Sequence, residues 1–183
     1  MSKAVLVLED GKVFKGESFG YPEECIGEVV FNTGITGYQE ILTDPSYMGQ
    51  IVVMTYPLIG NYGINDEDEE SKGIKVKGLA VREYSEVPGN WKYSDTLNSY
   101  LVKNKIPGIC GLDTRALTKY LRSKGSMKGI ISNRCENIDL LVEKAKAMNY
   151  DSCCSSLEAG TKEPYHIPGN GCRVTVLDFG VKE

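Results

Sequence analysis

Short apolar runs, rich in β-branched residues and bounded by turn-forming residues, recur through the first half of the chain. Because their length suits strands better than helices, each run predicts a buried β-strand. The runs are residues 4–8, 28–31, 50–55 and 74–81. Asp10-Gly11 follows the first run as a hairpin signal, so residues 12–14 should form the returning strand. In the last run apolar and polar residues alternate, and Gly78 interrupts them as at a bulge or a close approach.

Apolar residues return with helical spacing in the second half of the chain, which predicts three amphipathic helices. We expect these helices to start at Ser94, Asp113 and Asn137, the last of them running to Met148. Their buried sides should carry Leu97, Tyr100 and Leu101; Ala116, Leu117, Tyr120 and Leu121; and Leu141, Ala145 and Met148. Asp113 and Asn137 are suitable N-caps, and Gly125 is well placed to close the middle helix.

Two further short strands should lie between these helices. Pro107-Gly108 is expected to break the chain before a strand at residues 109–110, and Ile130-Ile131 indicates another. A strand-rich first half followed by alternating strands and helices predicts an α/β fold, with a mixed sheet and helices packed against it.

The periodicity disappears between residues 149 and 172, where serine, glycine and proline dominate. This composition is typical of a linker. Residues 173–178 predict a last strand. We therefore expect one domain over residues 1–150, a linker over 151–172, and the start of a further unit at 173–183.

The stretch between residues 31 and 65 holds an unusual number of glycine, threonine and tyrosine residues. Thr36 is a good N-cap and Gln39 completes a capping box, which predicts a short helix. Asp44-Pro45 should end this helix and leave Ser46 on an exposed turn. Such a hydroxyl could meet a ligand or another domain. The alternative is an ordinary strand–helix–strand core unit with no further role.

Composition and charge exclude several classes of function. The net charge of −4, with both signs interspersed, argues against a dedicated nucleic-acid surface. No apolar run approaches the roughly 20 residues that a membrane helix needs. The N-terminus lacks a signal-peptide hydrophobic region, so we expect a cytoplasmic protein without a membrane partner.

Cysteine and histidine offer little chemistry. The six cysteines show no CxxC pair and no zinc-ligand spacing, so we expect reduced thiols and no metal site. His166, the only histidine, lies in the predicted linker. A nucleophile built from His166 and Cys153 or Cys154 would define a cysteine hydrolase, but a flexible linker is a poor place to hold that geometry.

Two charged features each admit two interpretations. The acidic run of residues 66–70 is either a solvated loop or a surface that meets basic groups on a partner. Arg115 is either a solvated residue or one that binds a specific carboxylate, in this chain or another subunit. Arginine is disfavoured at the positive end of a helix, which supports the second interpretation.

Three separated motifs carry a family resemblance. They are FNTGITGYQEILTDPSYMGQIVVMTYPLIGNYGIN followed by DEDEES, GLDTRALTKYLRSKGSMKGII, and VTVLDFGVKE. Together they resemble the N-terminal half of the small, glutamine-using subunit of carbamoyl-phosphate synthase. The resemblance implies a swivelling β/β/α layered domain. It also implies that residues 173–183 hold the first strand of a class I glutamine amidotransferase domain.

The resemblance also implies roles for individual residues. Ser46 matches the serine of the TDPSY motif that helps hold glutamine, and Gly34, Ile35 and Thr36 match a segment that borders the path of ammonia. The glutaminase nucleophile and its partners belong to the following domain, so we expect no catalytic residue within residues 1–183. This segment should need no cofactor, since ATP and Mg are used by the large subunit.

The family further implies a place in carbamoyl phosphate synthesis, for pyrimidine and arginine formation, as the smaller partner of a heterodimer. The expected partners are the large subunit, the glutaminase domain and glutamine. A different class of function, a stand-alone interaction module without an enzymatic role, remains as the alternative. A reading frame that continues beyond Glu183 into a glutaminase would distinguish the two.

Overall fold

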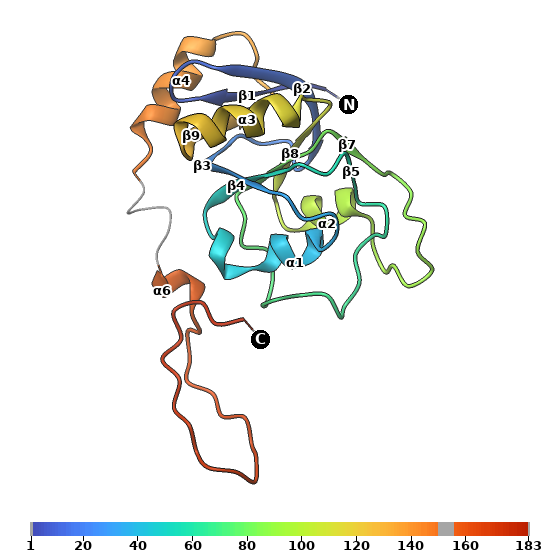
Figure 1. Cartoon of the computed structure of the whole chain (residues 1–183), viewed down its shortest axis with the longest axis vertical. Coiled ribbons are helices and arrows are strands. Elements are labelled where there is room, and N and C mark those ends of the chain that lie inside the picture. Colours follow the sequence, from blue (N-terminus) through green and yellow to red (C-terminus); the bar gives the residue numbers. More distant parts are fainter. Residues whose placement is uncertain (1, 150–155, 183) are drawn as a thin grey trace.

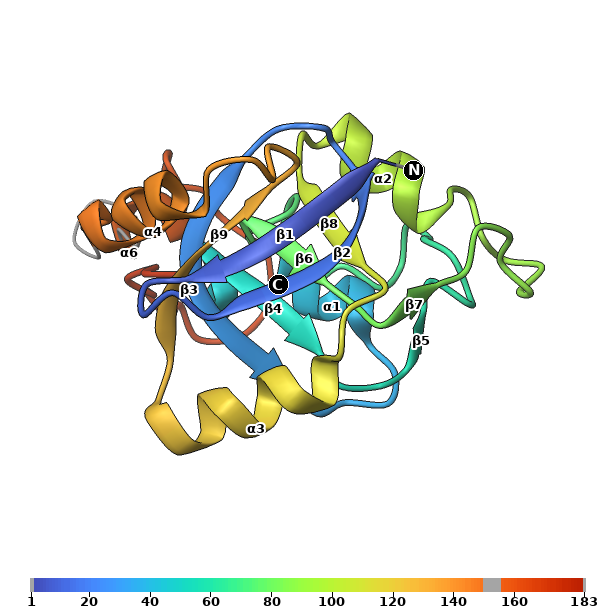
Figure 2. The ribbon, with the colours of Figure 1, turned by 90° about the horizontal axis from the view of Figure 1, so that it is seen from above.

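A computed structural model describes residues 2–149 and 156–182 of the chain. Its main feature is a seven-stranded sheet that closes on itself as a barrel (Figures 1 and 2). In order around the barrel the strands are β1 (Lys3–Leu8), β2 (Val13–Gly20), β8 (Pro107–Cys110), β6 (Gly78–Ala80), β4 (Gln50–Met54), β3 (Cys25–Asn32) and β9 (Met127–Ser132). The β1–β9 pair completes the ring.

The barrel is a mixed sheet, as the sequence predicts. Strands β3, β4, β6 and β8 run parallel to one another, whereas β1, β2 and β9 join them through antiparallel pairs. The α/β class is therefore confirmed. The sequence did not predict that the sheet closes. The pairing of β1 with β9 joins residues more than a hundred positions apart, so no local pattern indicates it.

Helices α1 (Tyr38–Thr43), α2 (Leu97–Lys103) and α4 (Ile138–Ala147) pack on the outside of the barrel, whereas α3 (Thr114–Lys124) packs through Leu117 and Leu121 against the interior cluster. The chain also forms the 3-10 turn η1 (Pro45–Tyr47) and the short helix α6 (Ser156–Ala159). A small two-stranded sheet, β5 (Leu58–Ile59) with β7 (Glu83–Tyr84), lies beside them. Figure 1 shows α4 near β1 and β9, and the C-terminal segment on the side of α1.

Alternate residues along the strands separate an inner cluster from two outer ones. On β1, Leu6 and Leu8 join the interior cluster, while Val5 and Val7 face α4. On β4, Ile51 lies in the interior cluster and Val52 packs with the α1 and α2 side. Because both faces of these strands are buried, their sequences are continuously apolar rather than alternating.

Several boundaries differ from the prediction. The strand expected over residues 74–81 is limited to β6, and the helix expected from Ser94 begins after its N-cap Thr96. Pro107 and Gly108 belong to β8 instead of breaking the chain. Glycine is required at position 108 because a Cβ atom there would lie 2.5 Å from the ring of Phe19.

The structure also bears on the predicted helix ends, on the burial of Ala116 and on the predicted last strand. Asp113 and Asn137 cap α3 and α4 through side-chain hydrogen bonds, and Gly125 ends α3, as expected. Ala116 is exposed, contrary to the expectation that it faces the core. Residues 173–178 form no strand, and their apolar side chains Val174, Val176 and Leu177 are exposed. A strand needs a neighbour to pair with, and the described residues give this segment none.

Candidate functional site

The helix α1 is capped by a distant tyrosine rather than by the predicted Thr36–Gln39 box. Gly37 precedes the helix in a left-handed conformation, with φ 84°, which favours glycine. The Tyr62 hydroxyl accepts hydrogen bonds from the backbone N–H groups of Gly37 (2.7 Å) and Tyr38 (3.0 Å). These amides would otherwise lack partners. The capping-box prediction is therefore wrong, and no side chain of the Thr36 turn caps the helix.

The Gln39 side chain binds the backbone of Asn65 and does not complete a capping box. Its side-chain amide donates to the Asn65 carbonyl (2.5 Å), and its oxygen accepts from the Asn65 N–H (2.9 Å). Tyr38 stacks on Tyr62 with ring centroids 4.1 Å apart, and its hydroxyl donates to the Gly63 carbonyl. Burial raises the pKa of both tyrosines, so both are neutral hydrogen-bonding groups. Together these contacts fasten α1 to the loop of residues 60–65.

The turn that carries Ser46 is rigid. Pro45 is buried at the start of η1, and the Asp44 carboxylate accepts the backbone N–H of Ser46 at 2.8 Å. Ser46 itself is exposed, as predicted. The Asp44-Pro45 boundary also ends α1, as predicted, because Asp44 takes an extended conformation with ψ 121°.

Asn32 joins the two segments that the sequence singles out. Its side-chain oxygen accepts from the Gly34 N–H (2.6 Å), and its side-chain amide donates to the Tyr47 hydroxyl (2.8 Å). The Gly34–Thr36 loop therefore lies beside the Ser46 turn. Ile35 is 68% exposed and Thr36 is also exposed.

Asn32, Tyr47 and Tyr62 were not identified from the sequence as supports of this site. The Asn32–Tyr47 and Tyr62–Gly37 contacts span 15 and 25 positions along the chain, beyond the reach of local pattern, whereas the Asn32–Gly34 contact spans two. Their only local signal was the concentration of polar and aromatic residues in this stretch.

The C-terminal segment contacts the same turn from another side. Lys182 Nζ lies 2.9 Å from one Asp44 oxygen and 3.5 Å from a Glu70 oxygen. Burial raises the pKa of the Asp44 carboxyl, but hydrogen bonds from Lys182 and Ser46 outweigh it, and the net pKa is lowered. Asp44 is thus a carboxylate that links the C-terminal segment to the Ser46 turn.

The acidic run of residues 66–70 makes contacts within the chain. Glu70 meets Lys182, Glu67 lies 3.8 Å from Lys92, and Glu69 accepts a hydrogen bond from the Tyr100 hydroxyl. The basic groups that this run meets are therefore, at least in part, those of its own chain.

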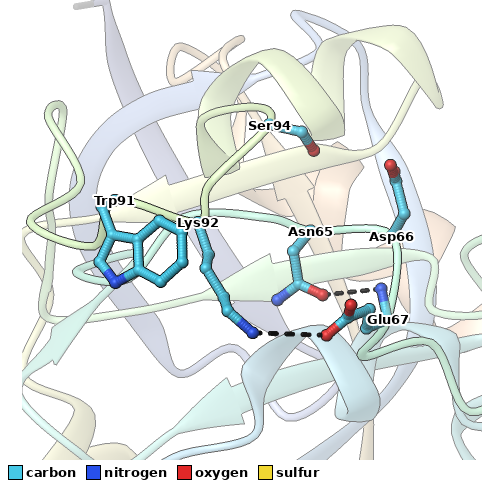
Figure 3. A pocket seen from close by; sticks show the side chains of 6 residues that line it. All are labelled: Asn65, Asp66, Glu67, Trp91, Lys92 and Ser94. Atoms are coloured by element: carbon cyan, nitrogen blue, oxygen red, sulfur yellow. Dashed lines mark hydrogen bonds and ion pairs between the residues drawn. The ribbon is translucent and has the colours of Figure 1, made fainter.

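An open pocket of about 300 Å³ adjoins this run. Its lining residues are Asn65, Asp66, Glu67, Trp91, Lys92 and Ser94. Figure 3 shows Lys92 reaching toward Glu67, with Trp91 beside it. Trp91 is 87% exposed, so the pocket has no closed wall. The pocket is linked to the Ser46 region through the hydrogen bond from the Asn65 N–H to the Gln39 side chain, which lies on α1.

The cysteine and histidine side chains of the described residues lie in different surroundings. Cys25 is buried, and burial raises its pKa to about 12, so it is an unreactive thiol. Cys153 and Cys154 lie outside the described residues, and His166 is exposed in the 160–172 segment. Within residues 2–149 and 156–182 no group of acidic, histidine or cysteine side chains could hold a metal ion. In the same residues no helix is both long and apolar enough to cross a membrane.

A mixed sheet that closes as a barrel, with helices packed against it, defines an α/β domain. The family model for the carbamoyl-phosphate synthase small chain, CPSase domain, matches residues 6–131. The chain belongs to this family, which confirms the resemblance seen in its motifs.

Curated relatives agree with this assignment. The chain is 55% identical over 181 residues to a carbamoyl phosphate synthase small chain from Clostridium perfringens, covering 99% of this chain and 51% of that protein. It is 48% identical over 180 residues to a carbamoyl phosphate synthase pyrimidine-specific small chain from Halalkalibacterium halodurans, covering 98% and 49%. The corresponding Bacillus subtilis pyrimidine-specific small chain is 49% identical, with the same coverage of 98% and 49%. The chain thus spans about half the length of the curated relatives it matches.

Proposed function

We propose that this chain is the N-terminal part of the small subunit of a glutamine-hydrolysing carbamoyl-phosphate synthase. In this proposal residues 1–150 dock to the large subunit, residues 151–172 link them to the glutaminase domain, and residues 173–183 begin that domain. The complete assembly is a cytoplasmic ligase, and its product serves pyrimidine and arginine formation. Its large subunit supplies the ATP and Mg chemistry.

The role proposed for this chain is to complete a glutamine site and the start of an ammonia path. The observation that carries it is the Asn32 bridge, which ties the Gly34–Thr36 loop to the turn of Ser46. A protein hydroxyl that is held on a fixed turn, as Ser46 is, loses little conformational entropy when it binds a ligand. The Lys182–Asp44 contact supports the same reading, since it holds the chain that leads into the next domain against this turn.

The ammonia path gives the Gly34–Thr36 loop its function. Ammonia attacks an electrophile only while it is unprotonated, so a route that excludes water protects it. Small and apolar residues suit the wall of such a route. In this proposal Gly34, Ile35 and Thr36 border the route, and Ser46 hydrogen-bonds glutamine beside its entrance.

The test is Ser46→Ala in the small subunit assembled with its large subunit. We expect the KM for glutamine to rise about tenfold or more, because a hydrogen bond to substrate is lost. Synthesis from added ammonia should not change, because it bypasses the glutamine site. The matched control is Ser123→Ala, an exposed serine on α3. Equal glutamine kinetics in the wild type and Ser46→Ala would contradict the role of Ser46.

A second measurement addresses the rival function. The 183-residue chain alone, given glutamine, should release no ammonia. Turnover that disappears when Cys153 or Cys154 is replaced would establish a cysteine hydrolase instead. Failure of the chain to bind the large subunit would favour a separate interaction module.

A further inference from the structure

The pocket of about 300 Å³ beside the acidic run has no part in the proposed function. Its walls come from two loops, residues 60–67 after β5 and residues 85–95 after β7. Its volume lies at the small end of the range for pockets that bind small molecules. Figure 3 shows Trp91 and Lys92 side by side, with the Lys92 ammonium group reaching Glu67 on the other loop.

Backbone hydrogen bonds hold the two loops together. The Gly89 N–H donates to the Asn61 carbonyl at 2.8 Å. The Ile64 N–H donates to the Asp95 carbonyl (2.9 Å), and the Ser94 N–H donates back to the Ile64 carbonyl (2.8 Å). The pocket therefore has a fixed frame, and a ligand that binds there pays little to order it.

Two of the lining side chains are already bonded within the chain. The Asn65 side-chain oxygen accepts the Glu67 N–H (2.8 Å), and the Ser94 hydroxyl donates to a backbone carbonyl (3.1 Å). The groups that remain for a ligand are the Trp91 ring and the carboxylates of Asp66 and Glu67. Trp91 is 87% exposed, so its ring is open to a stacking partner.

Lys92 holds a cation beside these groups through two long contacts. Its Nζ atom lies 5.7 Å from the centre of the Trp91 ring and 3.8 Å from a Glu67 carboxylate oxygen. Both distances are close to the outer limits for a cation–π contact and for an ion pair. The Lys92 and Glu67 side chains are 55% and 80% exposed, so their contact contributes little in water. Another cation could therefore displace Lys92 at low cost.

A guanidinium group suits this arrangement better than the ammonium group of a lysine. It is planar and stacks on an aromatic face, and its paired N–H groups match the two oxygens of a carboxylate. It is also more weakly hydrated than an ammonium group, so it gives up less on leaving water. The ring of Trp91 and the carboxylate of Glu67 supply these two kinds of contact.

The charge around the pocket favours a ligand without an acidic group. Asp66 and Glu67 outnumber Lys92 in the lining, and the acidic run continues through residues 68–70. This negative potential attracts cations and repels anions. We propose that the pocket binds small compounds that carry a guanidinium group and no carboxylate. The guanidinium group lies between Trp91 and Glu67, in the place that Lys92 now takes.

Titration of the 183-residue chain with agmatine, a guanidinium compound without a carboxylate, tests this inference. Trp91 is the only tryptophan in the sequence, so tryptophan fluorescence reports on this pocket alone. We expect a saturable change with a midpoint on the order of 1 mM at constant ionic strength. Cadaverine, which has the same charge as agmatine but only ammonium groups, should cause no saturable change.

Two variants should move the affinity for agmatine in opposite directions. Glu67→Gln removes the carboxylate partner and should weaken binding about threefold or more. Lys92→Gln removes the internal competitor and should tighten binding about threefold or more. The matched controls Glu143→Gln on α4 and Lys119→Gln on α3 make the same changes of net charge at exposed positions. Both should bind agmatine within about twofold of the wild type.

Several outcomes would overturn the inference. Agmatine could cause no saturable change, or cadaverine could match it. Lys92→Gln could bind no more tightly than Lys119→Gln, which would mean that Lys92 does not compete for the site. Binding of a capped arginine peptide without binding of agmatine would assign the pocket to a protein partner instead. None of these measurements involves Ser46 or glutamine, so the proposed function stands or falls separately.

Discussion

At the scale of single residues, one hydroxyl organises the start of α1. The Tyr62 hydroxyl accepts hydrogen bonds from the backbone N–H groups of Gly37 and Tyr38, and Thr36 does not cap the helix as predicted. Tyr62→Phe removes this acceptor while keeping the ring that stacks on Tyr38. We expect the free energy of unfolding to fall by about 1–2 kcal/mol, the usual effect of a lost helix cap.

Urea unfolding followed by circular dichroism measures this change. Thr36→Ala is the matched comparison, because a capping box would make it costly. The structure has no side-chain cap at this turn, so Thr36→Ala should change the free energy of unfolding by less than about 0.5 kcal/mol. A larger effect for Thr36→Ala than for Tyr62→Phe would restore the capping-box interpretation.

The same residues show how far the candidate site could be predicted. The exposed Ser46 and the end of α1 follow from Asp44-Pro45, since proline restricts the residue before it. The partners of Gln39 and Asn32 did not follow. Gln39 meets Asn65, 26 positions away, and only the folded chain brings them together.

At the scale of elements, α4 is held to the barrel by a narrow apolar contact. Leu141 and Ala145 are buried against Val5, Val7 and Ile130. Leu141→Ala should lower the free energy of unfolding by about 2–4 kcal/mol, because it leaves a cavity between α4 and β1. The neighbouring Leu140 is 52% exposed, so Leu140→Ala should cost less than about 1 kcal/mol.

The two variants differ by one position and remove the same atoms. Thermal and urea unfolding of both therefore isolates the effect of burial. Equal losses would mean that α4 does not pack on the barrel through the face that includes Leu141.

Element prediction from sequence succeeded where local chemistry decides the structure. The caps Asp113 and Asn137 and the strands β1, β3 and β4 follow from residues a few positions apart. Barrel closure and the inclusion of Pro107 and Gly108 in β8 depend on distant partners, such as the Phe19 ring over Gly108. The segment of residues 173–178 shows the converse, because strand propensity without a neighbouring strand produces no strand.

At the scale of the whole molecule, the C-terminal segment is fastened to the barrel through Asp44. The lowered pKa of this carboxyl means that its ionised form is the one that the folded chain stabilises. The contribution to stability is therefore fully present above the unfolded pKa of about 3.9. It is lost as the pH falls through the lower, folded value.

This linkage predicts how Lys182 affects the titration of Asp44. In the wild type the carboxyl-carbon NMR signal of Asp44 should titrate with a midpoint below the ordinary pKa of an aspartate. Lys182→Ala removes the ammonium group 2.9 Å away, so the midpoint should rise toward the ordinary value. Lys162→Ala, an exposed lysine in the same C-terminal region, should leave it unchanged. If Lys182→Ala and the wild type titrate alike, the C-terminal segment is not held at this turn in solution, and the support that this contact gives to a glutamine site between two domains is lost.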